Sequence, residues 1–145
     1  MNTFPIINSL ILLAISGLHF FWAFGGRWGA SAAIPTNQEG KMMLNSAGNF
    51  PSVFATLVVA FGLLTMALLH LEKVQIIQLS LPNWVANLGL KMIAGIFLIR
   101  AIGEFRYVGF FKKIKGTTFA ILDTKYYSPL CIVLSFNAFM TAFYL

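Results

Sequence analysis

Charge is scarce in this sequence. Asp, Glu, Lys and Arg together make up 10% of the 145 residues, and only four of these are acids. Soluble domains carry about 25% charged residues. Hydrophobic residues make up 59% of the chain. This composition excludes an ordinary soluble domain, a disordered chain and a charged coiled coil.

Residues that assemble metal and covalent sites are also few. Cys131 is the one cysteine, which excludes an internal disulfide and a thiolate metal cluster. Four acids are too few for a di-metal carboxylate site. The sequence has no HExxH, CxxC, phosphate-binding glycine loop or nucleophile elbow. We therefore expect no metal and no cofactor, and no hydrolysis by the known metal or triad routes.

Long apolar runs are abundant, in contrast. A helix needs about 20 apolar residues to cross a hydrocarbon core of about 30 Å. Four runs approach that length, at residues 6–24, 52–71, 84–104 and 129–145. The sequence therefore predicts an all-α fold, a membrane four-helix bundle, as one transmembrane domain over residues 1–145.

Basic residues concentrate in two of the three connections between these runs, 25–51 and 105–128. Lys and Arg favour the cytoplasmic side, so we predict both long loops in the cytoplasm and both termini outside. The net charge of +6 then reflects topology, and no nucleic-acid partner is expected. Aromatics mixed with lysines over 105–115 suit contact with lipid headgroups, which makes membrane lipids the expected partner.

Ionisable residues inside predicted spans are candidates for function because their burial is costly. His19 and Arg100 lie about 8 Å and about 6 Å from the cytoplasmic ends of their spans. Glu104 stands four residues after Arg100, a spacing that predicts an ion pair on one helix face. These residues and their neighbours toward the same surface form the candidate ligand-binding set: His19, Trp22, Arg27, Trp28, Arg100, Glu104, Arg106, Asp123 and Tyr127. For His19, a structural interhelical hydrogen bond and a functional role both stay open.

Other polar residues are given structural roles or none. His70 is predicted at the opposite, external interface, about 20 Å from His19, too far for the two to share a metal or a haem iron. Lys91 is expected to extend its ammonium toward the interface. Ser128 before Pro129 is typical of a helix N-cap and first turn. That interpretation leaves Asp123 without a structural role, which makes it the stronger functional candidate.

Three blocks of sequence carry a resemblance. The first is His19, Trp22 and GGRWG at 25–29, the second is RAIGEFRYVGF at 100–110, and the third is DTKYYSPL at 123–130. Together they resemble the pattern of a small bacterial membrane-protein family of unknown function. The resemblance implies a compact four-helix integral membrane protein of the bacterial cytoplasmic membrane, and it implies no activity.

Three functions are compatible with these residues. The leading hypothesis is a binding protein whose polar pocket at the cytoplasmic mouth holds a lipid headgroup or an amphiphilic small molecule. Arg100 and Arg27 would pair with an anionic group, and Trp22 and Trp28 would pack on the apolar part. The second is an enzyme in which His19, with Glu104 or Asp123, moves a proton on a lipid-soluble substrate. The third is a small transporter acting as a homo-oligomer, with Lys91 and Arg100 along its path.

Overall fold

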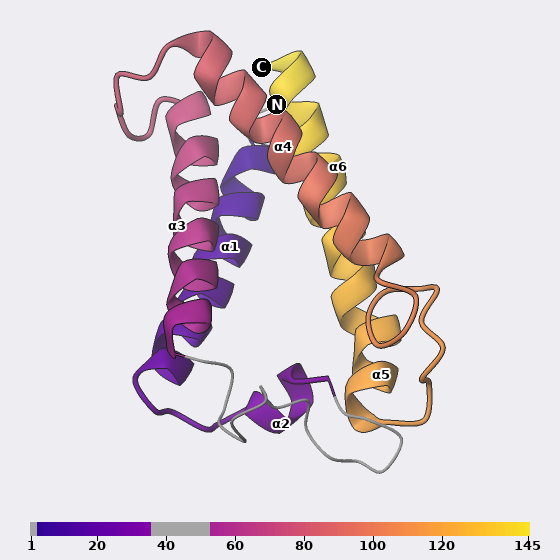
Figure 1. The fold of residues 1–145 in the computed structure, drawn as a ribbon. Coiled ribbons are helices and arrows are strands. Elements are labelled where there is room, and N and C mark those ends of the chain that lie inside the picture. The colour runs from indigo at the N-terminus through magenta and orange to yellow at the C-terminus, as the bar shows by residue number, and fades with distance from the viewer. Residues whose placement is uncertain (1–2, 36–52) are drawn as a thin grey trace.

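Helices joined by loops make up the part of the chain that the computed structural model describes, residues 3–35 and 53–145 (Figure 1). The long helices are α1 (Thr3–Ala23), α3 (Val53–Lys73), α4 (Asn83–Ile102) and α6 (Ser128–Tyr144). Three short segments are α2 (Ala30–Ala33), α5 (Thr118–Leu122) and the π-helix η1 (Asp123–Tyr127). Four helical runs, the last being 118–144, are long and apolar enough to cross a membrane. The all-α four-helix prediction is confirmed.

The first three spans agree with the predicted runs to within a few residues. The predicted start of the second, at 52, lies outside the described residues. The third helix ends at Ile102 and not at Glu104, because Gly103 adopts a φ of 89°. That left-handed conformation terminates a helix, and glycine adopts it without a steric penalty. Glu104 therefore lies in the loop after α4.

The fourth helical run begins much earlier than predicted. It is continuous from Thr118 through η1 into α6, so Ser128 lies inside a helix and the N-cap interpretation is wrong. Pro129 has no N–H and cannot complete a regular helical turn. The preceding π turn, in which the Ser128 N–H donates to the Asp123 carbonyl, accommodates the proline without ending the helix.

The long helices pack as two pairs, α1 with α3 and α4 with α6. The pairs meet at the end that carries both termini and the α3–α4 connection, and they separate toward the end that carries α2 and α5 (Figure 1). There the Tyr127 hydroxyl donates to the Ala32 carbonyl over 3.2 Å. This contact ties α2 to the helical run that contains α6.

Serine hydroxyls join neighbouring helices through alanine carbonyls. The three bonds are Ser9 to Ala67 at 3.0 Å, Ser16 to Ala60 at 2.8 Å and Ser135 to Ala94 at 2.7 Å. Small residues let helix backbones approach closely, and a hydroxyl–carbonyl bond in apolar surroundings adds to the packing. The first two bonds hold α1 on α3, and the third holds α6 on α4.

His70 is fully buried where the pairs meet, so its predicted position at the interface is wrong. Its Nδ1 lies 2.8 Å from the Met66 carbonyl, which assigns the proton to Nδ1 and leaves Nε2 to accept from Asn8 Nδ2 at 3.1 Å. Asn8 also donates to the Leu134 carbonyl at 3.0 Å and accepts from Asn137 Nδ2 at 3.0 Å. One network therefore joins α1, α3 and α6.

Substituting Asn8→Ala should lower the free energy of unfolding by about 1–2 kcal/mol, because His70 Nε2 and Asn137 Nδ2 lose their partner while they stay buried and the Leu134 carbonyl loses its bond to Asn8. Denaturation in mixed micelles, followed by circular dichroism, measures the change. The matched control is Asn83→Ala at the exposed start of α4. Equal losses in the two variants would contradict a network role for Asn8.

Candidate functional site

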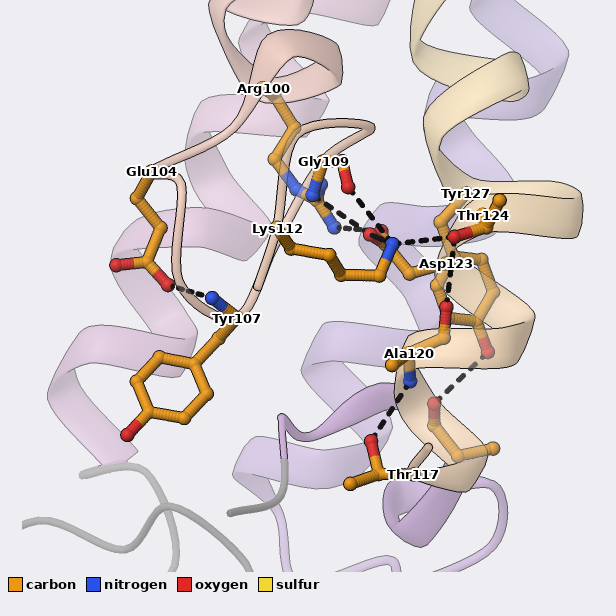
Figure 2. A network of polar contacts seen from close by, with 11 residues as sticks. Arg100, Glu104, Tyr107, Gly109, Lys112, Thr117, Ala120, Asp123, Thr124 and Tyr127 are labelled. Atoms are coloured by element: carbon orange, nitrogen blue, oxygen red, sulfur yellow. Dashed lines mark hydrogen bonds and ion pairs between the residues drawn. The ribbon is translucent and has the colours of Figure 1, made fainter. Parts of the chain in front are cut away.

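Asp123 is fully buried and accepts from three donors (Figure 2). Its Oδ1 accepts from Arg100 Nη2 at 2.9 Å. Its Oδ2 accepts from Lys112 Nζ at 2.9 Å and from the Gly109 N–H at 2.8 Å. Two cations thus face one carboxylate, which leaves one uncompensated positive charge. The Asp123 cluster comprises the residues joined by these bonds together with Thr124: Arg100, Gly109, Lys112, Asp123 and Thr124.

Lys112 is the functional candidate that sequence reasoning missed. Its side chain is 1% exposed, and its ammonium also donates to the Gly109 carbonyl at 2.9 Å and to Thr124 Oγ1 at 2.7 Å. With Asp123 these acceptors use all three ammonium N–H groups. Its neighbour Lys113 is exposed, and the local spacing of a lysine pair does not reveal which member points inward.

The loop after α4 folds back on the end of that helix. The Phe110 N–H donates to the Ala101 carbonyl at 2.9 Å, and the Phe111 N–H lies 3.4 Å from the Ile102 carbonyl. The last carbonyls of a helix have no partner within it, so the loop supplies partners that would otherwise be missing.

Two glycines make this return possible. Gly103 and Gly109 have φ angles of 89° and 86°, and their backbones lie against each other. A Cβ on Gly109 would overlap the Gly103 backbone, and one on Gly103 would overlap the Val108 carbonyl. The close approach directs the Gly109 N–H to Asp123.

Glu104 does not form the predicted ion pair with Arg100. An i,i+4 pair requires a helix through both residues, and α4 ends at Ile102. Glu104 is exposed, and its Oε1 accepts from the Tyr107 N–H at 2.7 Å (Figure 2). The exposed Arg106 guanidinium lies 5.1 Å from the Tyr107 ring centroid.

Four other predicted residues lie around the end of α1. His19 Nδ1 lies 2.8 Å from the Ile15 carbonyl, and its ring stands edge-on to Trp22 with centroids 5.0 Å apart. Trp22 Nε1 donates to the Trp28 carbonyl at 2.8 Å. Arg27 and Trp28 are exposed. His19, Trp22, Arg27 and Trp28 are called the α1-end group.

The predicted set is thus divided between two clusters at one end of the molecule. The structure records no hydrogen bond, ion pair or ring contact between His19 and Arg100, and α1 separates from α4 toward this end (Figure 1). Tyr127 provides a link, through its bond to α2. Within residues 3–35 and 53–145 no three His, Cys, Asp or Glu side chains are placed to hold a metal ion.

Two buried polar atoms of the described chain have no hydrogen-bond partner, Arg100 Nη1 and Ser128 Oγ. Both residues lie beside Asp123: Arg100 donates to its carboxylate, and the Ser128 N–H donates to its carbonyl. A guanidinium offers parallel N–H groups to carboxylate or phosphate oxygens. Arg100 Nη1 is thus an unused donor beside Asp123.

Replacing Gly109 by alanine should open the loop after α4, because the new Cβ overlaps the Gly103 backbone and a positive φ is unfavourable for alanine. Amide hydrogen exchange over 109–111 should accelerate at least about tenfold, because the expected loss of local stability is at least about 1.4 kcal/mol. Gly116→Ala is the matched control, since a Cβ there meets nothing within 4 Å. Unchanged exchange in Gly109→Ala would overturn this account of the loop.

Asp123→Asn should destabilise the protein more than Lys112→Met. Removing the carboxylate leaves two cations near each other, with an expected cost of about 3–5 kcal/mol, as for a broken buried pair. Lys112→Met keeps the Arg100–Asp123 pair and fills the space of the lysine stem. Thermal unfolding in detergent ranks the variants, with the exposed Lys113→Met as control. A larger loss for Lys112→Met would show that the lysine, and not the carboxylate, holds the cluster together.

A family model described as a protein of unknown function (DUF3995) matches residues 12–138, a segment that contains both the Asp123 cluster and the α1-end group. No curated protein and no solved structure matches the chain. Because the matched segment covers most of the sequence, the chain belongs to the DUF3995 family.

Proposed function

We propose that this protein is a multi-pass membrane protein that binds an amphiphile with an anionic headgroup at the end where the Asp123 cluster lies. The proposal rests on one observation. Arg100 contributes one of its terminal nitrogens to Asp123, and the other, Nη1, is buried without a partner in a cluster of net positive charge.

Electrostatics favour an anion at this position. An uncompensated charge in apolar surroundings is costly, and a carboxylate or phosphate oxygen on Arg100 Nη1 would lower that cost. Lys112 has no free N–H for a ligand, since its three donors are already used. The Arg100 side chain is 33% exposed although Nη1 itself is buried, so the proposal requires the side chain to shift when an anion binds. Arg100 is therefore the contact residue, and Lys112 and Asp123 position it.

The surface at this end suits a membrane interface with anionic lipids. Exposed cations and exposed aromatic rings alternate around the loop after α4 and the start of η1: Phe105, Arg106, Phe110, Phe111, Lys113, Lys115, Lys125 and Tyr126. Such segments place rings at headgroup level and ammonium groups at lipid phosphates. The same basic bias supports an orientation in which this end faces the cytoplasm of a bacterial cell.

The α1-end group supplies the second part of the proposed site. Arg27 and Trp28 are exposed, and Trp22 is half-buried, so all three offer surface to a bound molecule. In the proposal Arg27 offers a second cation to an anionic group at this end of the molecule, and the two indoles pack on the apolar part of the amphiphile.

The enzyme hypothesis has less support from the contacts. Glu104 accepts from a loop N–H, Asp123 accepts from three donors, and His19 donates along its own helix. A general acid–base pair needs groups within hydrogen-bond reach of one substrate, and these three side chains are engaged separately. The binding function is therefore the one that the geometry favours.

The test compares phosphatidylglycerol with phosphatidylcholine of identical chains, added to the detergent-solubilised protein and counted by native mass spectrometry. Arg100→Gln should reduce the preference for phosphatidylglycerol about tenfold, the effect of losing one hydrogen bond to a charged group. Asp123 keeps Lys112 in this variant, so the fold should be retained, as circular dichroism can verify.

Arg106→Gln is the matched control, because Arg106 is exposed on the loop after α4 and its substitution removes the same charge from the same end of the molecule. An equal effect of both substitutions would mean that general surface charge, and not a site at Arg100, governs binding. Full binding by Arg100→Gln would exclude the proposed site.

A further inference from the structure

A groove of about 520 Å³ runs between α4 and α6. Because the two helices are antiparallel (Figure 1), the residues that line it fall in order along its length. Lys91 and Phe143 lie at the end nearer the chain termini, Gly95 and Phe139 lie in the middle, and Leu98 and Ile132 lie at the other end. Its volume is in the range of small-molecule and lipid-chain sites.

Lys91 is the charged residue of this groove. It lies about 12 Å from the start of α4, and its ammonium reaches the Phe143 ring, 4.8 Å from the centroid. Phe143 is the penultimate residue of α6. The ammonium therefore extends along the groove to the level where α6 ends. In a membrane protein a lysine extends in this way so that its charged group lies at the membrane interface while its stem covers apolar surface.

No carboxylate of the described chain neutralises Lys91. Among the residues at this end, Glu72 accepts from the Leu79 N–H at 2.6 Å, and Lys73 donates to Asn87 Oδ1 at 2.7 Å. An aromatic face alone stabilises an exposed ammonium by only about 0.5–1 kcal/mol. An anion at the mouth of the groove would be a stronger partner.

We propose that this groove binds one acyl chain of a phospholipid whose anionic headgroup pairs with Lys91. From Lys91 to Leu98 the groove follows about 10 Å of α4, and its lining below Lys91 is mostly apolar. Gly95 keeps the floor open, since a Cβ there would meet nothing within 4 Å. An acyl chain in the groove makes dispersion contacts with the apolar lining that are missing when the groove is empty. The Lys91 ammonium favours a headgroup with a negative charge.

This site is independent of the one proposed at Arg100. Lys91 lies beside Phe143 at the end of α6, whereas Arg100 lies two residues before the end of α4 and about 13.5 Å further along that helix, so the two sites lie at different levels of the α4–α6 pair. The experiment is therefore carried out both in the wild-type chain and in Arg100→Gln, which lacks the other site. Failure of one proposal then leaves the other measurable.

The probes are phosphatidylglycerol and phosphatidylcholine with identical chains, counted on the detergent-solubilised protein by native mass spectrometry. Lys91→Gln should reduce the preference for phosphatidylglycerol about fivefold, which corresponds to about 1 kcal/mol for one lysine near an anionic headgroup. Binding of phosphatidylcholine should not change. Lys113→Gln, in the exposed loop at the other end, is the charge control.

Gly95→Leu tests the groove itself. The Cβ of a residue at this position meets nothing within 4 Å, and a leucine side chain there takes up space in the groove. It should therefore reduce occupancy by both lipids at least about threefold, the low end of the effect of burying an apolar group. Gly17→Leu is the matched control, because Gly17 is exposed on α1 and also has open space around it.

Equal binding by Gly95→Leu and Gly17→Leu would overturn the groove site. Loss of both lipids to the same degree in Lys91→Gln would overturn the role of charge. A dimer that forms in the wild type and is lost in Gly95→Leu would show that a second copy of the chain, and not a lipid, occupies the groove.

Discussion

A single buried carboxylate organises the end of the molecule where the candidate site lies. Asp123 binds Arg100 of α4, the Gly109 N–H of the loop and the Lys112 ammonium. The loop has no helix or strand of its own, and these bonds fix its path across the end of α4. The Asp123 cluster carries two cations and one carboxylate. The ion pairs that fix the loop therefore also leave the positive charge on which the proposed binding of an anion depends.

Polar contacts are placed at both ends of the bundle and serve different purposes. At one end the neutral network of Asn8, His70 and Asn137 joins α1, α3 and α6 with its polar atoms paired. At the other, charged end, Arg100 Nη1 and Ser128 Oγ are unpaired. A satisfied buried network fixes helix register, whereas an incomplete one leaves donors that water, an ion or a ligand can satisfy. This contrast is the reason for placing function at the Asp123 cluster.

Hydropathy predicted the four long helices because apolar length is a property of each segment alone. Depth along a span made Arg100 a candidate, and the apparent lack of a structural role made Asp123 one. The structure joins the two in an ion pair and gives Asp123 three donors, and the N-cap assigned to Ser128 was wrong. Lys112 and His70 were misjudged because the direction of a side chain depends on contacts with distant segments. The ion pair predicted for Glu104 failed for a local reason: Gly103 ends α4 two residues before the acid.

The distribution of unneutralised cations explains why the proposed ligands are defined by charge and not by headgroup structure. Arg100 has one unpaired buried nitrogen, and Lys91 has an aromatic ring as its partner. Recognition of one particular headgroup would require several donors and acceptors at fixed positions. A single N–H or a single ammonium distinguishes an anion from a neutral molecule and little else. Because Lys91 lies beside the end of α6 and Arg100 beside the end of α4, the two proposals place anionic headgroups at two different levels of the α4–α6 pair.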